Sequence, residues 1–474
     1  MKVLLLLLLV IPAQLLSQSS IAIRHINIVD VRTGAIKPDQ MVIIKGNKID
    51  DIGADNQKSR KSVTQEVDAT GKFLIPGLWD MHIHIQGDLG DRQYYNEFAV
   101  PIFLANGITG IRTTRGSRPE VLMRDSIERN LLIAPRLVVG TPIVDGPYPF
   151  LQGFLPISNE SRVPVVVDSL QALGYDFLKV YSKMPRDIFF ALAAYCRQKN
   201  FPIAGHVPLG VPTEQASAAG LRSIEHTTGL NKSFTDNEDS MCRVWEKELA
   251  DTRGPLASRE LFLRAEYRTF GPFNRAKAEK VATTLINNHT AVVPTFVVLA
   301  AGRKNRDSLM KMPALAYVSK AQRQEWYDFR GRPQTSGIDS SIKIISERFE
   351  DILEQVNFLN KQGVLILAGT DCLYPFIVHG FSLHDELELY VKAGLTPLQA
   401  LRTATLNPAI FLKRETELGT VEKGKLADVV ILEKNPLADI GNTRNVYAVI
   451  MNGNLIGNSK LNQFLKQLKE RAAK

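Results

Sequence analysis

Cysteine is scarce in this chain, which has three cysteines among 474 residues. Cys196, Cys242 and Cys372 are too few and too widely spaced to form the disulfide framework that stabilises small secreted domains. Cys372 follows Asp371 and is expected to be a buried, inert thiol. The fold must therefore depend on hydrophobic cores, and the length suffices for one large domain and a small one.

Clusters of basic residues interleaved with aromatic residues are also lacking, although the net charge is +9. Lysine and arginine are spread along the chain, which excludes the sequence signature of a nucleic-acid-binding protein. The positive charge is instead a general basicity that favours contact with acidic surfaces. No short-period internal repeat is present, so a repeat architecture is not indicated.

Long hydrophobic runs are absent except at the N-terminus. Lys2 supplies a positive charge, residues 3–10 are nearly all leucine, and Pro12 and Ser17 end the apolar run. A run of about 14 residues is shorter than the roughly 20 residues that a membrane-spanning helix needs. We therefore predict a cleavable signal peptide over residues 1–19, export to a periplasm or to the cell exterior, and no transmembrane segment after signal removal.

What the chain does contain is a set of metal-ligand residues at the ends of apolar segments. The segment FLIPGLWDMHIHI, residues 73–85, holds Asp80, His82 and His84. Residues two apart in a strand point to the same side, so His82 and His84 can direct two imidazoles at one metal ion. A lone His-x-His pair is a weak indication, and it gains weight from the segments that follow.

Four further residues of ligand type each follow an apolar, strand-like run. Each run has the length of a buried parallel strand. Strand ends that converge on one face are how a (β/α)₈ barrel builds its active site, so the ordered strand ends predict such a site. Taken singly, these residues would be a surface lysine, core histidines and a helix cap. They are Lys179 in DFLKVYS, His206 in FPIAGHVP, His226 in LRSIEHT and Asp371 in VLILAGTD.

Strand and helix patterns alternate between the two chain ends, which predicts an α/β fold with a parallel sheet. We predict a (β/α)₈ TIM-like barrel over residues 76–411. Apolar and polar residues alternate at both ends, 20–75 and 412–460, which predicts short strands that form one small β-sandwich. The eight barrel strands are expected near residues 79–83, 108–113, 136–140, 177–181, 202–206, 223–226, 291–298 and 364–368.

One stretch departs from this alternation. Residues 231–280 separate the sixth and seventh predicted strands, carry charged and aromatic residues, and look helical in ELFLRAEYRTF and AKAEKVATTLI. A long insertion at the catalytic face of a barrel is often a lid. An additional packed pair of helices is an equally good interpretation, and the sequence leaves both open. The last segment, SKLNQFLKQLKERAAK, is expected to be a helix that packs on the domain surface.

These motifs resemble those of the amidohydrolase superfamily, and in particular the branch that groups imidazolonepropionase-like proteins with metal-dependent dipeptidases. The resemblance covers nearly all of the chain after the leader, and its most specific marks are PGLWDMHIH, SIEH, AGTD and GTVEKGKLADVVILEKNPL. In that superfamily the last of these segments returns the chain to a small β-sandwich. Before it, LTPLQALRTATLNPAIFL is expected to begin a helix at Thr396-Pro397 and to be interrupted at Asn407-Pro408.

The resemblance implies a metal centre with two divalent ions. A free ammonium has no lone pair and cannot bind a metal, whereas a carboxylated lysine is an anionic oxygen ligand. Zinc suits the mixed histidine and carboxylate set best, with manganese, iron and cobalt left open. The implied ligands are His82, His84 and Asp371 for the more buried ion, His206 and His226 for the second ion, and Lys179, carboxylated on its amine, as the bridge.

The implied reaction is hydrolysis of a carbon–nitrogen bond in an amide, a dipeptide or a cyclic amide. The ions lower the pKa of a bridging water, and the metal-bound hydroxide attacks the carbonyl. Asp371 is the candidate catalytic residue that accepts the hydroxide proton and returns it to the leaving nitrogen. The substrate is expected to be a small molecule or a short peptide, and a homo-oligomer is left open.

Three further residues are candidates for contact with the substrate. Tyr181 lies two residues after Lys179, on the same side of that strand, and is a candidate catalytic residue that donates a hydrogen bond to the tetrahedral oxyanion. Packing at the barrel rim is an equally good interpretation of Tyr181. Arg112 and Arg115 end the second strand and are predicted to bind a substrate carboxylate, as a dipeptidase-like activity would require.

Two departures from the superfamily pattern limit the substrate assignment. Dipeptidase-like members tend to have a glycine-rich turn after the strand-four lysine, where this chain has YSKM, residues 181–184. After the strand-six histidine they tend to have Gly-Tyr, where this chain has TTG, residues 227–229. These loops shape the pocket, so the metal site is better supported than a named substrate.

Two alternative functions stay open. The first is a mononuclear imidazolonepropionase-like or deaminase-type enzyme, which Lys179 argues against, because a single ion needs no bridging lysine. The second is a catalytically inactive binding module, which the retention of all six ligand-type residues argues against. In the mononuclear case the single ion would be held by His82, His84, His206 and Asp371.

Overall fold

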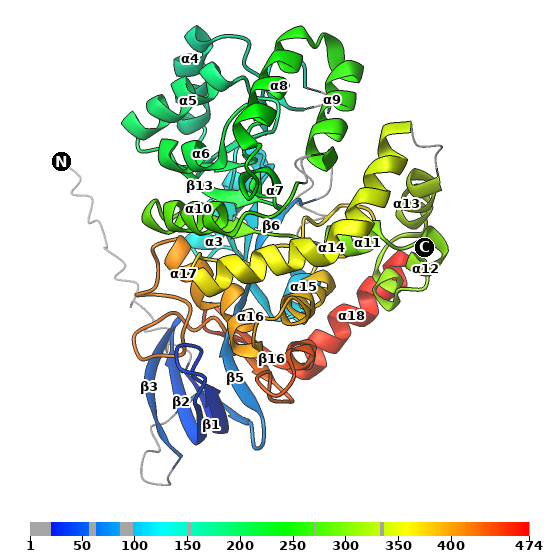
Figure 1. Ribbon diagram of the computed structural model, residues 1–474. Coiled ribbons are helices and arrows are strands. Elements are labelled where there is room, and N and C mark those ends of the chain that lie inside the picture. The colour runs from blue at the N-terminus through cyan, green and yellow to red at the C-terminus, as the bar shows by residue number, and fades with distance from the viewer. Residues whose placement is uncertain are drawn as a thin grey trace, which may run out of the picture.

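The computed structural model describes residues 20–55, 63–85, 98–149, 151, 153–268, 271–331 and 336–473. The signal peptide predicted over residues 1–19 lies outside the described residues and stays a prediction. Within the described part of the chain, no helix has both the length and the apolar character that a membrane crossing requires. Figure 1 shows strands at the centre surrounded by helices, with a sheet from the start of the chain at one end.

Parallel strands at the centre belong to two sheets. One sheet has the order β6-β7-β8, and the other has the order β10-β9-β11-β12-β13-β14. All the strand pairs within these sheets are parallel, as the alternation of strands and helices predicts. The strands are β6 (Leu78–Ile83), β7 (Ile108–Thr113), β8 (Arg136–Val139), β9 (Val144–Asp145), β10 (Leu155–Pro156), β11 (Leu178–Val180), β12 (Ile203–Gly205), β13 (Leu221–Glu225) and β14 (Ala291–Val293).

Isolated parallel bridges join the two sheets into a closed ring. The segment 364–368 takes the eighth place without forming a regular strand, and Val292 exchanges hydrogen bonds with Leu365 and Leu367 of this segment. The closed barrel confirms the predicted fold class. The bridges are Gly140 with Phe177, Val292 with Ile366, and Ile83 with Cys372.

The seventh barrel strand is shorter than predicted. β14 ends at Val293, whereas the expected strand ran to residue 298. Thr295 has a left-handed backbone, with φ at 51°, and helix α11 (Phe296–Gly302) begins at the next residue. The buried carboxylate of Glu386 accepts hydrogen bonds from the N–H groups of Phe296 and Val297, at 2.9 and 2.8 Å. This carboxylate satisfies the first turn of α11, so a helix replaces the end of the strand.

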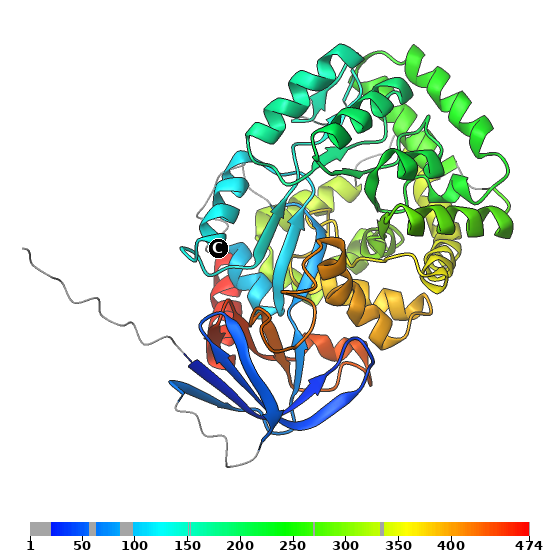
Figure 2. The ribbon, with the colours of Figure 1, turned by 90° about the vertical axis from the view of Figure 1, so that its left-hand side faces the viewer.

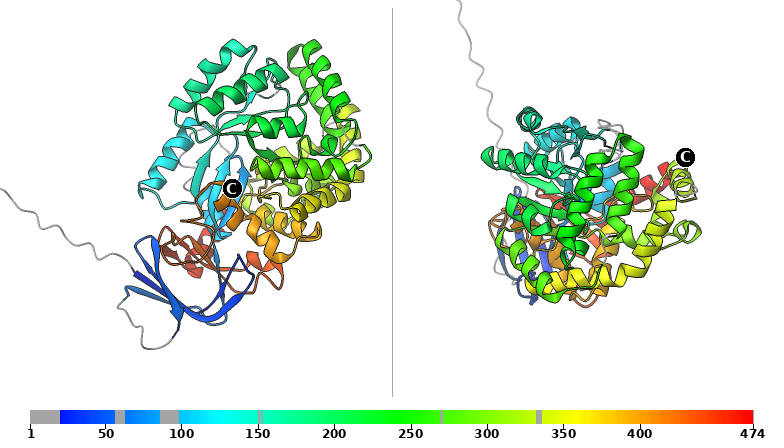
Figure 3. Two further views of the ribbon diagram at one scale, coloured as in Figure 1. Left: turned by 60° about the vertical axis from the view of Figure 1, so that its left-hand side comes forward. Right: turned by 45° about the horizontal axis from the view of Figure 1, so that its top comes forward.

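Helices cover the outside of the barrel, as the two views of Figure 3 show. Helix α16 begins at Pro397 behind a capping box formed by Thr396 and Gln399, which confirms the predicted start. The expected interruption at Asn407-Pro408 falls earlier, because α16 ends at Thr403 and both residues lie within α17. Apart from α11, the helices of the insertion and α18, the helices are α2 (Val100–Ala105), α3 (Arg118–Glu128), α4 (Val163–Ala172), α5 (Arg186–Gln198), α6 (Thr213–Ala219), α10 (Arg275–Asn287), α12 (Arg306–Leu309), α13 (Lys320–Gly331), α14 (Ser336–Gln362), α15 (Phe381–Lys392), α16 (Pro397–Thr403), α17 (Leu406–Phe411) and the short η3 (Glu160–Arg162), η4 (Pro313–Tyr317) and η5 (Ile440–Arg444).

The insertion after β13 is helical, as its sequence predicts. It contains α7 (Leu230–Ser233), α8 (Glu238–Asp251) and α9 (Gly254–Arg268). Helices α8 and α9 lie side by side in Figure 1 and share a small apolar cluster of their own with Leu209. Lys183, which follows β11, donates to Ser258 Oγ of α9 at 2.6 Å and lies 3.0 Å from the carboxylate of Asp145. Buried polar contacts therefore fix the insertion to the barrel.

Strands from both chain ends form one sheet of eight strands. The order is β17-β16-β15-β5-β1-β2-β3, with β4 paired to β1, and Figure 2 shows it at one end of the molecule. Apolar residues of both ends share one cluster, which confirms the predicted β-sandwich beside the barrel. Helix α18 (Asn458–Ala472) packs on α2 and η4, as expected. The strands are β1 (Ser20–Val29), β2 (Ile36–Lys45), β3 (Lys48–Ala54), β4 (Gln65–Asp68), β5 (Phe73–Pro76), β15 (Val429–Leu432), β16 (Val446–Met451) and β17 (Asn454–Ile456).

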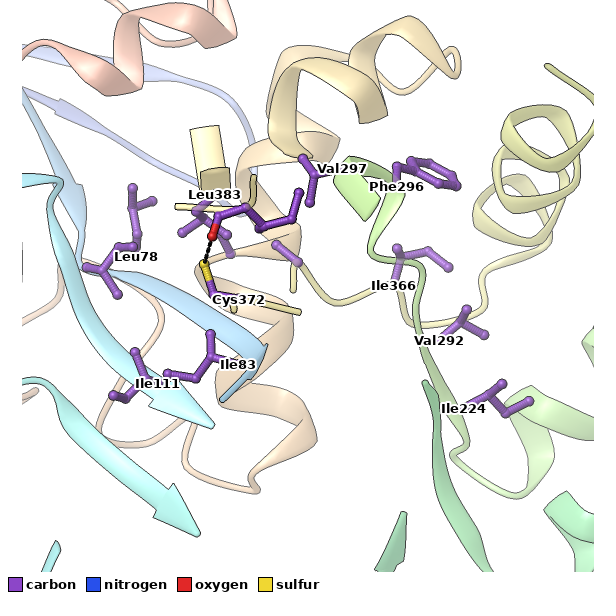
Figure 4. Packing of buried hydrophobic residues seen from close by; sticks show 14 of the residues in the cluster. Leu78, Ile83, Ile111, Ile224, Val292, Phe296, Val297, Ile366, Cys372 and Leu383 are labelled. Atoms are coloured by element: carbon purple, nitrogen blue, oxygen red, sulfur yellow. Dashed lines mark hydrogen bonds between the residues drawn. The ribbon is translucent and has the colours of Figure 1, made fainter. Parts of the chain in front are cut away.

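Alternate residues of a barrel strand belong to different apolar clusters. Val292 belongs to the large cluster drawn in Figure 4, which includes side chains of the surrounding helices. Its neighbours Ala291 and Val293 belong to a separate cluster with Trp79 and Met81. The two-residue period of the strand thus gives each face its own core.

Cys372 lies in the large cluster, as Figure 4 shows. Its thiol is buried and donates to the carbonyl of Ile377 at 3.4 Å. Burial raises the pKa of this thiol well above its ordinary value, so the group is protonated and inert, as the sequence led us to expect.

Candidate metal centre

The ends of β6 and of the segment 364–368 bring His82, His84 and Asp371 together. The Nε2 atoms of His82 and His84 lie 3.3 and 3.0 Å from Oδ1 of Asp371. The N–H groups of Thr370 and Asp371 both donate to the carbonyl of His82, which fixes the two strand ends to each other. The His82 side chain is 1% exposed, whereas His84 and Asp371 are 28% and 14% exposed. The site therefore begins in the core and opens to solvent.

The ends of β11, β12 and β13 supply Lys179, His206 and His226 to the same place. The ring centre of His226 lies 4.7 Å from that of His82 and 5.0 Å from that of His206. One potential ligand atom from each of His82, His226 and Asp371 lies within 4.8 Å of the others, a spacing suited to a metal ion. His82, His84, His206, His226 and Asp371 thus converge on one face of the barrel, and, in addition to burial, Lys179 is near enough to lower the pKa of His206 and of His226.

Hydrogen bonds engage the Nδ1 atoms of three of these histidines. When Nδ1 is engaged in this way, Nε2 is the nitrogen whose lone pair stays available for a metal. The three rings therefore have the arrangement that metal-binding histidines adopt in proteins. The pairs are His82 with Glu225 Oε2 at 2.6 Å, His206 with Ser182 Oγ at 2.7 Å, and His226 with Thr295 Oγ1 at 2.7 Å.

The protonation states of the cluster suit cation binding. Burial holds the pKa of His206 well below its ordinary value and lowers the pKa of His226 to about 3, so both imidazoles are neutral at neutral pH. Burial opposes ionisation of Asp371, but His226, His82 and His84 together hold its pKa well below the usual range. Neutral imidazoles and an ionised carboxylate are the forms that bind a divalent metal, so the donor set fits such an ion.

Lys179 is buried, with 1% exposure, and is close enough to His206 and His226 to add to the lowering of their pKa values by burial. Burial lowers the pKa of its amine to about 8, against the opposing influence of Glu225. A fraction of this amine is therefore neutral at physiological pH. Only the neutral form has the lone pair that can react with carbon dioxide.

The structure places Arg112 beneath the metal site and not at the substrate position predicted for it. Its side chain is 1% exposed. Nη1 donates to Glu225 Oε1 and to the Met81 carbonyl, both at 3.1 Å, and Nη2 donates to Ser223 Oγ at 2.9 Å. A guanidinium buried and bonded in this way has no path to a substrate carboxylate, which corrects the assignment of Arg112.

Tyr181 and Arg115 lie at the rim of the site, where both are half-buried. The Tyr181 ring centre lies 4.1 Å from that of His206 and 5.7 Å from that of Phe262 in α9. The guanidinium of Arg115 lies 5.7 Å from the ring of Phe154, which in turn packs edge-on against Tyr181. The insertion therefore reaches the site through Phe262. The predicted oxyanion role of Tyr181 and carboxylate role of Arg115 stay predictions.

Three residues around the site have left-handed backbones, which residues other than glycine rarely adopt. The φ angles are 62° at His226, 51° at Thr295 and 56° at Asp371. Each such conformation costs roughly 1–2 kcal/mol and persists where surrounding contacts enforce it. Hydrogen bonds between His226 and Thr295, and from the Asp371 N–H to His82, supply that enforcement. The strand ends thus turn sharply to present their side chains.

Sequence reasoning missed the three groups that hold the histidine rings: Glu225, Ser182 and Thr295. Glu225 carried a usable signal, because a glutamate inside the apolar run LRSIEH must be buried with a partner. Ser182 and Thr295 carried none, since their contacts depend on the path of loops. Ser182 lies in the YSKM turn that departs from the superfamily pattern, so this departure supports the site.

A closed parallel barrel with a histidine and aspartate cluster at its strand ends defines a barrel metallohydrolase. The sequence model described as "Amidohydrolase family" matches residues 332–456. An ochratoxinase from Aspergillus niger is 39% identical over 426 residues, which cover 77% of this chain and 71% of the relative. This chain belongs to the amidohydrolase family, and it is a metal-dependent hydrolase of carbon–nitrogen bonds.

Two further comparisons agree with this family. A probable imidazolonepropionase from Danio rerio is 24% identical over 382 residues, which cover 77% of this chain and 75% of the relative. A crystal structure of a Xaa-Pro dipeptidase with bound methionine in its active site has a TM-score of 0.65 at 19% identity, and the match covers 93% of this chain and all of the neighbour. The structural likeness confirms the fold, a barrel with a sandwich built from both chain ends.

Proposed function

We propose that this chain hydrolyses the amide bond of a dipeptide or a related small molecule at a centre of two divalent metal ions. The observation that carries the proposal is the convergence of four histidines and Asp371, with the Nδ1 atoms of three of these histidines hydrogen-bonded to Glu225, Ser182 and Thr295. The dipeptidase among the structural neighbours supports the substrate class. Zinc is the proposed metal, because it favours histidine and carboxylate ligands.

The residues would divide the chemistry as follows. A divalent ion, when bound, polarises a carbonyl and lowers the pKa of water. Asp371 is partly exposed and contacts two histidines, so its carboxylate is placed to accept the proton of the attacking water and to pass it to the leaving nitrogen. The proposed ligands are His82, His84 and Asp371 for one ion, and His206 and His226 for the other, with Lys179 between them.

Carboxylation of Lys179 is part of this proposal. The neutral Nζ would attack carbon dioxide, form an N–C bond and release one proton, which leaves an anionic carbamate. Its support is the burial of Lys179, which lowers the pKa of its amine to about 8, and its influence on the nearby His206 and His226. In ¹³C NMR after exchange with labelled bicarbonate, a carbamate signal should appear in the wild type and disappear in Lys179→Ala. Lys183→Arg is the control, because Lys183 is equally buried but pairs with Asp145 and should not contribute the signal.

Metal analysis tests the number of ions. We expect about two per chain, falling in Lys179→Ala. One ion per chain, unchanged by Lys179→Ala, would favour a mononuclear imidazolonepropionase-like or deaminase-type enzyme. The compact group of His82, His226 and Asp371 favours a single ion, although it contains His226 in place of the His84 and His206 expected for the mononuclear case. Absence of bound metal in the wild type would overturn both.

Substrate screening tests the reaction itself. Dipeptides, N-acylated amino acids and cyclic amides are the compounds to compare. Arg115→Met should raise KM for substrates with a free carboxylate and leave KM unchanged for the same compounds with that carboxylate amidated. Tyr181→Phe should lower kcat if the hydroxyl donates a hydrogen bond to the oxyanion, and leave kcat unchanged if the ring only packs against His206.

Export is also proposed, with support from the sequence alone. Lys2 and the leucine-rich residues 3–10 have the composition of a signal peptide. Sequencing of the mature N-terminus after expression in the native host tests this. A mature chain that still begins at Met1 and stays in the cytosol would contradict it.

A further inference from the structure

An ion pair between Arg112 and Glu225 lies directly beneath the metal site. Arg112 is 1% exposed and Glu225 is fully buried. The two oxygens of Glu225 have separate partners: Oε2 meets Nδ1 of His82 at 2.6 Å, and Oε1 meets Nη1 of Arg112 at 3.1 Å. Ser223 Oγ donates to Oε1 at 2.5 Å as well. Glu225 is therefore a bridge between a buried cation and a metal-ligand ring.

The guanidinium of Arg112 is held from several directions. The rings of Phe177 and Phe411 lie at 4.4 and 5.1 Å from its central carbon. One of its hydrogen bonds goes to the carbonyl of Met81, the residue immediately before His82. Arg112 thus fixes both the backbone next to His82 and the carboxylate that contacts the His82 ring. Arg112 therefore supports the His82 ring indirectly, through the Met81 backbone and through Glu225.

We propose that Arg112 and Glu225 are positioning residues that hold His82 in the form with its proton on Nδ1 and its Nε2 lone pair directed at the metal. This inference rests on the proposed metal centre and goes beyond it, because it assigns to two buried residues a role in metal affinity. A carboxylate behind a ligand histidine fixes the orientation of the ring and raises its basicity.

The other two supported histidines provide an internal contrast. His206 and His226 contact the hydroxyl groups of Ser182 and Thr295, which are neutral. A neutral hydroxyl orients a ring but polarises it less than a carboxylate does. The ion that His82 binds should therefore be held more tightly than an ion that depends on His206. Stepwise removal with a chelator should release the two ions in two phases.

The test compares metal affinity among matched variants. Glu225→Gln keeps the size of the side chain but removes its charge. Glu120→Gln is the control, because Glu120 is also buried, at 5% exposure, but accepts a hydrogen bond from Ser117 and contacts no ligand residue. The dissociation constant of the tighter ion is measured by competition with a chelator. The visible spectrum of the Co²⁺-loaded protein reports the ligand geometry independently of activity.

We expect Glu225→Gln to weaken binding of the tighter ion by roughly 10–100-fold and to change the Co²⁺ spectrum. Glu120→Gln should change neither. Equal affinity and an unchanged spectrum in Glu225→Gln would overturn the inference while leaving the metal centre intact. A wild type that binds no metal would instead overturn the proposed function, so the two failures are distinguishable.

A second variant covers the case in which Glu225→Gln fails to fold. Loss of one charge leaves the Arg112 guanidinium buried without its partner, which destabilises proteins more than removal of both charges. The double variant Arg112→Met/Glu225→Gln removes both. A folded double variant with weakened binding of the tighter ion supports the inference, and one with wild-type affinity overturns it.

Discussion

The two sides of the metal site are supported in different ways. On the side of β6, His82 rests on the carboxylate of Glu225, which belongs to a barrel strand and is fully buried. On the side of β12 and β13, the histidine rings rest on hydroxyl groups of Ser182 and Thr295, which follow the strands in loops. The β6 side is thus supported by a strand of the barrel core, whereas the other side is supported by loops at the barrel rim, although Ser182 and Thr295 are themselves buried.

This difference in support suggests that the two sides have different tasks, retention of an ion on one side and substrate preference on the other. A core-supported side is rigid, because its neighbours are packed strands, and it suits tight retention of an ion. The rim side carries Tyr181 and, through α9 of the insertion, Phe262. Loops and insertions vary without cost to the barrel, so the rim is where substrate preference is set. The predictions that follow test this separation, starting from the largest expected effect.

Asp371 contacts His82 and His84 on the β6 side and lies in one compact group with His226 of the other side, so its loss should have the largest effect. Asp371→Asn keeps the size of the side chain but removes the charge that contacts His82 and His84. We expect kcat/KM to fall by about 10³-fold, within the range that general acid–base residues show. Asp385→Asn is the control, because Asp385 forms an exposed ion pair with Arg444. Equal activity of the two variants would contradict a chemical role for Asp371.

His384 is a buried histidine outside both sides, and it should affect a different property, the pH dependence of stability. Burial lowers its pKa from 6.5 to about 3. Between these pH values the imidazole of the unfolded chain binds a proton that the imidazole of the folded chain does not bind. The free energy of unfolding should therefore fall with decreasing pH, by about 1.4 kcal/mol per pH unit for this group.

Denaturant unfolding between about pH 7 and pH 5 checks this expectation. His384→Gln should reduce this pH dependence in the metal-free protein without abolishing it, because His206 and His226 also have lowered pKa values. The exposed His289→Gln serves as the control. An unchanged slope in His384→Gln would assign the acid sensitivity to the histidines of the site.

The rim hydroxyls should have an intermediate effect. Ser182→Ala and Thr295→Val remove the oxygens that contact Nδ1 of His206 and His226. We expect each to weaken the looser of the two ions by about tenfold, the lower end of the range for groups behind ligands, and to spare the tighter one. Thr290→Val is the control, because the buried Thr290 hydroxyl donates to the Leu221 carbonyl, away from the cluster. Equal loss of both ions would mean that the sides are not independent.

Phe262 should have the smallest effect, confined to the substrate. Phe262→Ala removes a ring that stacks on Tyr181, an interaction worth about 0.5–1.5 kcal/mol. We expect KM to change by about two- to tenfold, with metal content and kcat nearly unchanged. Phe273→Ala, which removes a 48% exposed ring in the same insertion, is the control. A fall in metal content with Phe262→Ala would show that the insertion supports the metal and not the pocket.

The sequence was sufficient to predict the fold and the site residues where periodicity and strand order determine the structure. The positions of His82, Lys179, His206 and Asp371 at strand ends follow from apolar runs that each end in one polar residue, and the barrel brings such ends together. The pairing of the two chain ends into one sheet followed from alternating residues at both ends and from the resemblance to a known family.

The sequence was insufficient to predict the position of a side chain or the end of a strand where a contact joins segments that are distant in the sequence. Arg112 was predicted to bind a substrate carboxylate because it ends the second strand, but its partner Glu225 lies 113 residues away. The left-handed turn at Thr295 ends β14 early, and Glu386, which accepts hydrogen bonds from the first turn of α11, lies 90 residues beyond Phe296. Neither contact has a local signature, because each depends on the closed ring of strands.

The sheet shared by both chain ends has a consequence for synthesis. Strand β5 ends at Pro76, and its antiparallel partner β15 begins at Val429. Until the ribosome has made β15, β5 has an open edge on that side, and open edges pair readily with other chains. The edge of β5 can therefore be covered only after β15 has been synthesised. Chains truncated before Val429 should aggregate instead of accumulating as soluble barrels.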